Sequence, residues 1–161
     1  MNIGIVSDTH SKPIPQQLIH DFENVDMIIH AGDFCGENDY KKFYEMKELK
    51  AVFGNMDEAK LKRLLPRRQI FKIGAVTFGL FHGEGTAANI FETVQNEFKK
   101  EKVNVVIFGH SHQPMNATIK GVLYFNPGSP NDAICAPYCS YGILEIQNDK
   151  VKGTILKVKE T

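Results

Sequence analysis

Residues 103–112 read Val-Asn-Val-Val-Ile-Phe-Gly-His-Ser-His, an apolar run that passes directly into two histidines. A short apolar run bounded by turn residues is typical of a buried strand in a parallel sheet. Runs of the same form occur earlier in the chain, and we predict buried strands at Ile3–Val6, Met27–Ile29, Ala51–Phe53, Val76–Phe81 and Val103–Phe108.

Segments with helical character lie between these strands, at Pro15–Phe22, Glu37–Lys47 and Ala87–Lys100. In the last segment, apolar residues recur at a spacing of four, which is one stripe of a helix. Strands that alternate with helices predict an α/β fold with a largely parallel sheet.

The end of the chain has a different pattern. Thr118–Phe125 predicts a hairpin about Lys120-Gly121. Tyr141–Ile146 and Val151–Val158 predict a second hairpin about Asn148-Asp149. We therefore expect a second, antiparallel layer.

Length and composition indicate an ordinary globular protein of 161 residues, and we expect a single domain over residues 1–161. The formal net charge is zero, which gives no strong signal for a protein that binds nucleic acid by neutralising many phosphates. No stretch reaches the roughly 20 apolar residues of a membrane span. The first residues lack the basic segment of a signal peptide, so we expect a cytoplasmic protein without a membrane partner.

Three cysteines, Cys35, Cys135 and Cys139, fit no zinc-finger spacing and are expected to be reduced thiols. Cys135 and Cys139 are four residues apart, a spacing that suits a metal pair on a helix. Pro137 between them favours a loop instead.

Metal-binding side chains follow each of the five predicted strands. They are Asp8, His10, Asp33, Asn55, His82, His110 and His112. A single histidine, or an Asp in a Gly-Asp turn, is more often structural. The joint pattern favours a site, because the carboxyl ends of the strands in an open α/β sheet form its ligand crevice. Imidazole, carboxylate and amide ligands without thiolate suit Mn, Fe, Co, Ni or Zn. Seven ligands exceed one tetrahedral site and suffice for two ions if a carboxylate bridges them.

These residues resemble the signature of the calcineurin-like metallophosphoesterases. The matching segments are Asp8-Thr9-His10, Gly32-Asp33, Gly54-Asn55, His82-Gly83 and Gly109-His110-Ser111-His112. The short chain and Asn126-Pro127-Gly128-Ser129 look like the small bacterial and archaeal phosphodiesterases of that superfamily. The resemblance covers residues 1 to about 158 and implies a four-layer αββα sandwich, with two mixed sheets flanked by helices.

By this resemblance, Asp8, His10 and His112 would hold one ion, and Asn55, His82 and His110 the other. Asp33 would bridge the two ions. The resemblance implies two divalent transition-metal ions, with manganese first and nickel, iron, cobalt or zinc as alternatives. It also makes a homo-oligomer plausible.

The implied chemistry is hydrolysis by a hydroxide that bridges the ions, with Asp33, Asn55 and His82 as catalytic residues. Two dications, two carboxylates and one hydroxide leave a single positive charge, which complements a small phosphodiester better than a doubly charged monoester. Three alternatives stay open: a phosphomonoesterase, a nuclease, and a non-catalytic protein-interaction scaffold like the retromer subunit of the same fold.

The sequence departs from the resembling proteins at two places. Met56 stands where larger members have a histidine that protonates the leaving group, and methionine cannot donate a proton. Asp57 could substitute, although a turn carboxylate is the favoured interpretation. Secondly, residues 130–139 lack the arginine that commonly follows the Asn-Pro-Gly-Ser turn.

Other residues have weaker signals. Residues 60–72 hold six cations and no acid, which favours a solvated face over a phosphate-steering patch. His30 is expected to support the site rather than bind an ion. His20 is expected to be an ordinary helix residue. Asn126 and Ser129 are candidates for lining the pocket.

Overall fold

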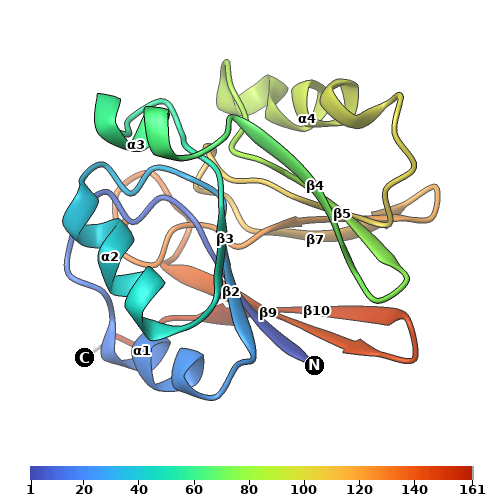
Figure 1. Ribbon diagram of the computed structural model, residues 1–161. Helices are drawn as coiled ribbons and strands as arrows, with labels where there is room; N and C mark the ends of the chain where they lie inside the picture. Colours follow the sequence, from blue (N-terminus) through green and yellow to red (C-terminus); the bar gives the residue numbers. More distant parts are fainter. Residues whose placement is uncertain (161) are drawn as a thin grey trace.

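The computed structural model describes residues 1–160 and contains two five-stranded sheets packed face to face (Figure 1). The strands are β1 (Asn2–Val6), β2 (Met27–His30), β3 (Leu49–Ala51), β4 (Arg68–Ile73), β5 (Val76–Phe81), β6 (Val105–Ile107), β7 (Met115–Ile119), β8 (Val122–Asn126), β9 (Ser140–Gln147) and β10 (Lys150–Lys157). The helices are α1 (Gln16–Glu23), α2 (Glu37–Met46), α3 (Ala59–Leu64), the 3-10 turn η1 (Ala87–Asn89) and α4 (Ile90–Phe98).

Both sheets are mixed. The first has the strand order β10-β9-β1-β2-β3, and β1, β2 and β3 run parallel. The second has the order β4-β5-β6-β8-β7, and β5, β6 and β8 run parallel. Antiparallel strands complete both sheets at their edges. The expected four-layer sandwich is confirmed, whereas the expectation of a separate antiparallel layer is wrong.

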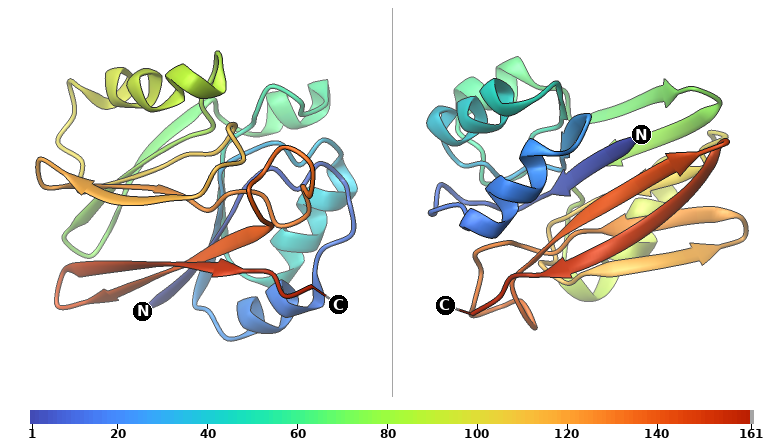
Figure 2. Two further views of the ribbon diagram at one scale, coloured as in Figure 1. Left: turned by 180° about the vertical axis from the view of Figure 1, so that it is seen from behind. Right: turned by 90° about the horizontal axis from the view of Figure 1, so that it is seen from below.

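Three apolar clusters lie between adjacent layers and hold the four layers together. The central cluster joins the inner faces of the two sheets through residues such as Ile5, Ile29, Phe78 and Phe125. Helices α1, α2 and α3 cover the outer face of the first sheet, and α4 covers the outer face of the second (Figure 2). The predicted stripe of α4 is confirmed, since Ile90, Val94 and Phe98 are all buried.

Several predicted boundaries shift. The third strand spans Leu49–Ala51 rather than 51–53, because the Phe53 amide donates to the Pro66 carbonyl and leaves the sheet. Both predicted hairpins are present, with positive φ at both central residues of each turn. Helix α3 and strand β4 occupy much of the cationic segment 60–72, where no element was predicted. Within residues 1–160, no helix has the length and apolar character needed to cross a bilayer.

Candidate metal centre

The candidate ligands lie where parallel strands of both sheets end. In chain order they are Asp8 and His10 after β1, Asp33 after β2, Asn55 after β3, His82 after β5, and His110 and His112 after β6. Parallel strands of one sheet end at the same edge, and the two sheets place these edges next to each other. The structure therefore brings residues more than 100 positions apart into contact.

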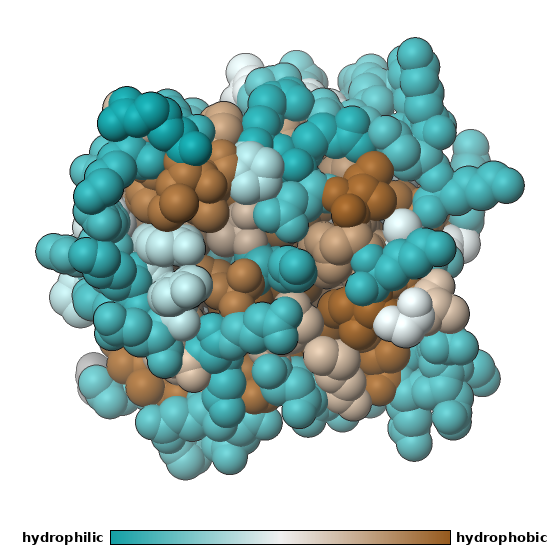
Figure 3. Space-filling view, viewed as in Figure 1, coloured by the Kyte–Doolittle hydropathy of each residue, from teal (hydrophilic) through white to brown (hydrophobic). Residues whose placement is uncertain are grey.

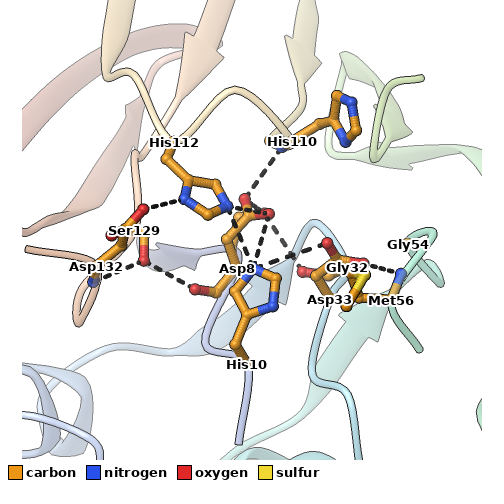
Figure 4. Close-up of polar contacts among 12 residues, drawn as sticks. Asp8, His10, Gly32, Asp33, Gly54, Met56, His110, His112, Ser129 and Asp132 are labelled. Atoms are coloured by element: carbon orange, nitrogen blue, oxygen red, sulfur yellow. Dashed lines mark hydrogen bonds and ion pairs between the residues drawn. The ribbon is translucent and has the colours of Figure 1, made fainter. Parts of the chain in front are cut away.

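One group of ligand atoms surrounds Asp8 (Figure 4). Its Oδ1 atom lies 3.3 Å from Nε2 of His112 and 3.7 Å from Nε2 of His10. The two imidazole Nε2 atoms are 3.2 Å apart. Asp8 is fully buried, and its Oδ1 atom has no hydrogen-bond partner. These three side chains have the compact arrangement of a metal site.

A second group of ligand atoms surrounds Asn55. Its Oδ1 atom lies 3.2 Å from Nε2 of His82 and 3.1 Å from Nδ1 of His110. The Nε2 atom of His110 donates to the Gly85 carbonyl at 2.7 Å, so its Nδ1 atom faces Asn55 with a free lone pair.

Asp33 lies between the two groups. Its Oδ2 atom is 3.2 Å from Nε2 of His82 and 3.8 Å from Nε2 of His10, so one oxygen faces a histidine of each group. The other oxygen accepts the Met56 amide at 2.8 Å. Asp8 also approaches the second group, since its Oδ1 atom is 3.8 Å from Nε2 of His82.

The electrostatics of this cluster favour cations. Burial opposes ionisation of Asp8, yet His82, His10 and His112 hold the pKa of its carboxyl well below the usual range. Burial alone would lower the pKa of His82, but Asp8 and Asp33 raise it to about 9. The hydrogen bond to Asp8 raises the pKa of His112 to about 9. Carboxylates that hold protons on the neighbouring imidazoles also favour divalent ions in place of those protons, so the residues present fit the metal centre that the resemblance implies.

The backbone at the site is turned sharply. Asp8, His10, Asp33, His110 and His112 all have positive φ, between 49° and 70°. Two glycines allow the segments to come close together. A Cβ atom at Gly109 would collide with Ser7 and Asp8, and one at Gly54 would collide with Asp33. Without a side chain at position 109, the His110 amide reaches Oδ2 of Asp8 at 3.1 Å.

Buried acids hold the loops that carry the ligands, and sequence reasoning did not find all of them. Asp57 accepts the amides of Asp33 at 3.0 Å, Cys35 at 2.8 Å and Gly54 at 2.7 Å. It is therefore the turn carboxylate that was favoured over a proton donor. Its position three residues after Gly54 is a local signal for a turn, but the contacts to Asp33 and Cys35 have no such signal.

His30 contacts the segments that carry Asp8 and Asp33, as expected for a residue that supports the site. Its Nδ1 atom accepts the Gly32 amide at 3.1 Å, and its Nε2 atom lies 3.1 Å from Oγ1 of Thr9. Thr9 in turn donates to the buried carboxylate of Asp39, which the sequence did not single out. The His30 ring stacks on Phe34 with centroids 3.5 Å apart.

Asn126 and Ser129 do not line an open pocket, since both are fully buried. Asn126 donates to the Gly109 carbonyl at 3.1 Å, and Ser129 donates to the Asp8 carbonyl at 2.8 Å. Their amide and hydroxyl groups are used to hold the backbone of ligand segments. Among the described residues, Cys135 and Cys139 are free thiols and belong to no metal-type cluster.

Comparison with known proteins agrees with the motifs. The model of the calcineurin-like phosphoesterase superfamily domain matches residues 1–149. A protein named probable metallophosphoesterase from Methanocaldococcus jannaschii is 32% identical over 165 residues, covering 99% of this chain and 83% of the relative. A protein named phosphodiesterase from the same archaeon is 30% identical and covers 98% of this chain and all of its own length.

Solved structures share the fold. A protein described as a novel archaeal phosphodiesterase has a TM-score of 0.77 at 27% identity, covering 97% of this chain and 100% of that chain. Vps29 of Entamoeba histolytica, solved with zinc, has a TM-score of 0.75 at 23% identity, covering 99% of this chain and 100% of that chain. At that identity the second likeness concerns the fold alone. Motifs, fold and family model agree, and the chain belongs to the calcineurin-like phosphoesterase superfamily.

Proposed function

We propose that this chain is a phosphodiesterase that uses two divalent metal ions. Asp8, His10 and His112 would hold one ion, Asn55, His82 and His110 the other, and Asp33 would contact both. The observation that carries the proposal is the convergence of lone pairs on one point, with the buried Oδ1 atom of Asp8 unpaired in front of three imidazoles. A buried carboxylate oxygen without a partner costs free energy unless a cation is bound.

The bound ions would make an attacking water available near neutral pH and neutralise charge on the phosphoryl oxygens. The protein residues fix where this happens. Asp33 presents one oxygen to both groups while the Met56 amide holds its other oxygen. The Ala31 carbonyl accepts Nδ1–H of His82 at 2.7 Å and directs Nε2 of that ring to Asp33 and Asn55.

The proposed substrate is a small phosphodiester. Asp8 and Asp33 are the two carboxylates among the ligands, so two dications leave a small positive excess that suits a singly charged phosphodiester group. The relatives described as phosphodiesterases support the same class. Manganese is the ion we expect first. A cytoplasmic location and a homo-oligomer stay predictions from the sequence.

The test is a hydrolysis panel with the metal-stripped protein reloaded with Mn²⁺, Ni²⁺, Co²⁺, Zn²⁺ or Mg²⁺. We expect hydrolysis of bis-p-nitrophenyl phosphate that is faster than hydrolysis of the p-nitrophenyl monoester, with cyclic nucleotides as a third substrate class. Asp33→Asn should reduce activity to the background rate and weaken both ions together, because one oxygen faces both groups.

Asp149→Asn is the matched control, since Asp149 is an exposed turn residue with the same change of charge. A faster monoester reaction would favour a phosphomonoesterase. No hydrolysis with any of the five metals would favour the interaction scaffold over the enzyme.

A further inference from the structure

The imidazole of His112 is held on both sides. Its Nε2 atom faces Asp8 at 3.3 Å, and its Nδ1–H donates to Oδ2 of Asp132 (Figure 4). An ionised carboxylate has no proton to give, so Nδ1 must carry the hydrogen of this bond. The neutral ring then has its lone pair on Nε2, the nitrogen that faces the proposed ion.

The Asp132 carboxylate is itself fixed by the loop that carries it. Oδ1 accepts the amides of Ile134 at 2.9 Å and Cys135 at 3.0 Å. The Asp132 amide donates to Oγ of Ser129 at 3.2 Å. Asp132 is only 5% exposed, so these contacts leave its side chain little freedom to rotate.

The loop is also attached to a second ligand segment. Ser129 donates its hydroxyl to the Asp8 carbonyl at 2.8 Å, and Asn131 donates to the Thr9 carbonyl at 2.9 Å. The loop that holds the His112 ring therefore also holds the backbone carbonyls of Asp8 and Thr9. Asp8 and His112 belong to the same group of ligands.

The other three candidate histidines have neutral partners. Nδ1 of His82 faces the Ala31 carbonyl, Nδ1 of His10 lies 3.3 Å from the Cys35 thiol, and Nε2 of His110 faces the Gly85 carbonyl. A carboxylate behind a ligating imidazole fixes the tautomer and raises the basicity of the ligand. Among the four imidazoles, His112 is the one with a carboxylate in this position.

We propose that Asp132 is a positioning residue that fixes the tautomer and orientation of His112, and thereby sets the affinity of the ion held by Asp8, His10 and His112. The inference rests on the proposed function and deepens it. It also gives the 130–139 loop a role in holding the metal centre, at a place where resembling proteins carry an arginine.

The test compares stepwise Mn²⁺ affinities by isothermal titration calorimetry. Asp132→Asn preserves the shape of the side chain and an acceptor for the amides of Ile134 and Cys135, but it removes the charge. We expect one of the two ions to bind about 10–100-fold more weakly, with the affinity of the other unchanged. Ala133→Ser, an exposed change in the same loop, should leave both affinities unchanged.

A double-mutant cycle separates positioning from a structural role. In a His112→Ala background, Asp132→Asn should have no further effect on the ions, because Asp132 acts through His112. The metal-free protein gives an independent signature. The hydrogen-bonded Nδ1–H of His112 should produce a low-field proton resonance that is lost in Asp132→Asn and retained in Ala133→Ser.

The outcomes distinguish the two proposals. A wild-type protein that binds no divalent ion overturns the proposed function. A protein that binds two ions with affinities unaffected by Asp132→Asn overturns this inference alone. Equal weakening of both ions, or the same weakening without His112, would also overturn it, because Asp132 would then act only on the fold.

Discussion

Met56 lies at the rim of the candidate site, with 57% of its surface exposed. Its backbone amide donates to Oδ1 of Asp33 and holds the backbone in place. The exposed side chain takes no part in this contact and can be replaced without breaking it. Methionine has no acidic proton to give to a leaving oxygen. Asp57 cannot supply one easily, because its carboxylate is buried and accepts three backbone amides.

Met56→His should therefore add a proton donor without disturbing the amide contact. We expect a rate increase toward the roughly 10²–10⁴-fold range of general acid catalysis for diesters with poor leaving groups. Diesters of nitrophenol should gain little, because nitrophenolate leaves without a proton donor. Initial rates on alkyl and nitrophenyl diesters measure the difference, and Met56→Leu is the control. An equal gain on both substrates would contradict this role.

At the scale of single residues, ligand candidates can be named from the sequence because each lies in a short segment that follows a strand. The structure brings the side chains of these segments together. The sequence does not predict Asp132, whose partner His112 comes from another loop. Asp39 is hidden for the same reason, since its partner Thr9 lies 30 residues away in the chain. A buried acid in a loop sequence has no periodic pattern to reveal its environment.

At the scale of elements, the two hairpin turns can be predicted from the residues of the turns themselves. Lys120 and Gly121 have φ of 49° and 80°, and Asn148 and Asp149 have φ of 51° and 61°. Positive φ at both central residues is the geometry of a type I′ turn, for which Asn-Gly is the preferred pair. Lys120 is a poor residue for this conformation because its Cβ atom crowds the backbone.

Lys120→Asn should stabilise the protein by relieving this crowding between β7 and β8. A left-handed residue costs roughly 1–2 kcal/mol, and asparagine tolerates the conformation better. We expect a gain of about 1 kcal/mol, or about 2–4 °C in melting temperature for a chain of this size. Urea and thermal unfolding measure it, and Lys120→Ala should give no gain. A stability equal to wild type would argue that the turn relaxes in solution.

The missed strand β4 shows where element prediction fails. Its segment was interpreted as a solvated cationic face. Arg67, just before the strand, contacts Glu84 and Glu97, and its guanidinium lies 4.6 Å from the Phe81 ring centroid. Arg68 pairs with Glu97 and Glu101 and lies over Phe98. Partners in distant segments neutralise these cations, and such pairing is invisible in a local window.

At the scale of the whole molecule, the strand pairings could not be predicted from the sequence. These pairings join segments that lie far apart in the chain. Strand β9 pairs with β1, so the second predicted hairpin extends the first sheet. Strand β8 pairs with β6 and brings the first hairpin into the second sheet. Amide side chains also link the two sheets. Gln69 donates to the Ala51 carbonyl at 2.9 Å, and Asn116 donates to the Gly153 carbonyl at 2.8 Å.

The exposed apolar residues are scattered and do not form one dominant apolar face on the side that Figure 3 shows. On the side seen in Figure 3, hydrophobic residues form several separate patches with hydrophilic residues between them. Exposed large apolar residues such as Tyr44, Leu64 and Ile134 come from different elements.

Ion binding should stabilise the molecule as one unit, because the ligands come from both sheets. At a free ion concentration one hundred times the dissociation constant, one bound ion adds about 2.7 kcal/mol. That corresponds to a rise in melting temperature of about 5–10 °C per ion. Differential scanning calorimetry with and without Mn²⁺ measures the rise, and Asp33→Asn should reduce it. Two separate transitions would contradict the expected single domain.

The left-handed backbone at the ligands has an evolutionary consequence. Five of the seven ligand candidates, Asp8, His10, Asp33, His110 and His112, have positive φ. Asp and His tolerate this conformation better than most residues, but glycine adopts it without any steric cost. A lineage that kept this fold only to bind other proteins would gain stability by exchanging these residues for glycine or asparagine. Mutational drift would therefore erode the motif soon after hydrolysis ceased to matter. The presence of all seven ligand candidates is what we expect of a chain that uses them in the proposed ion chemistry.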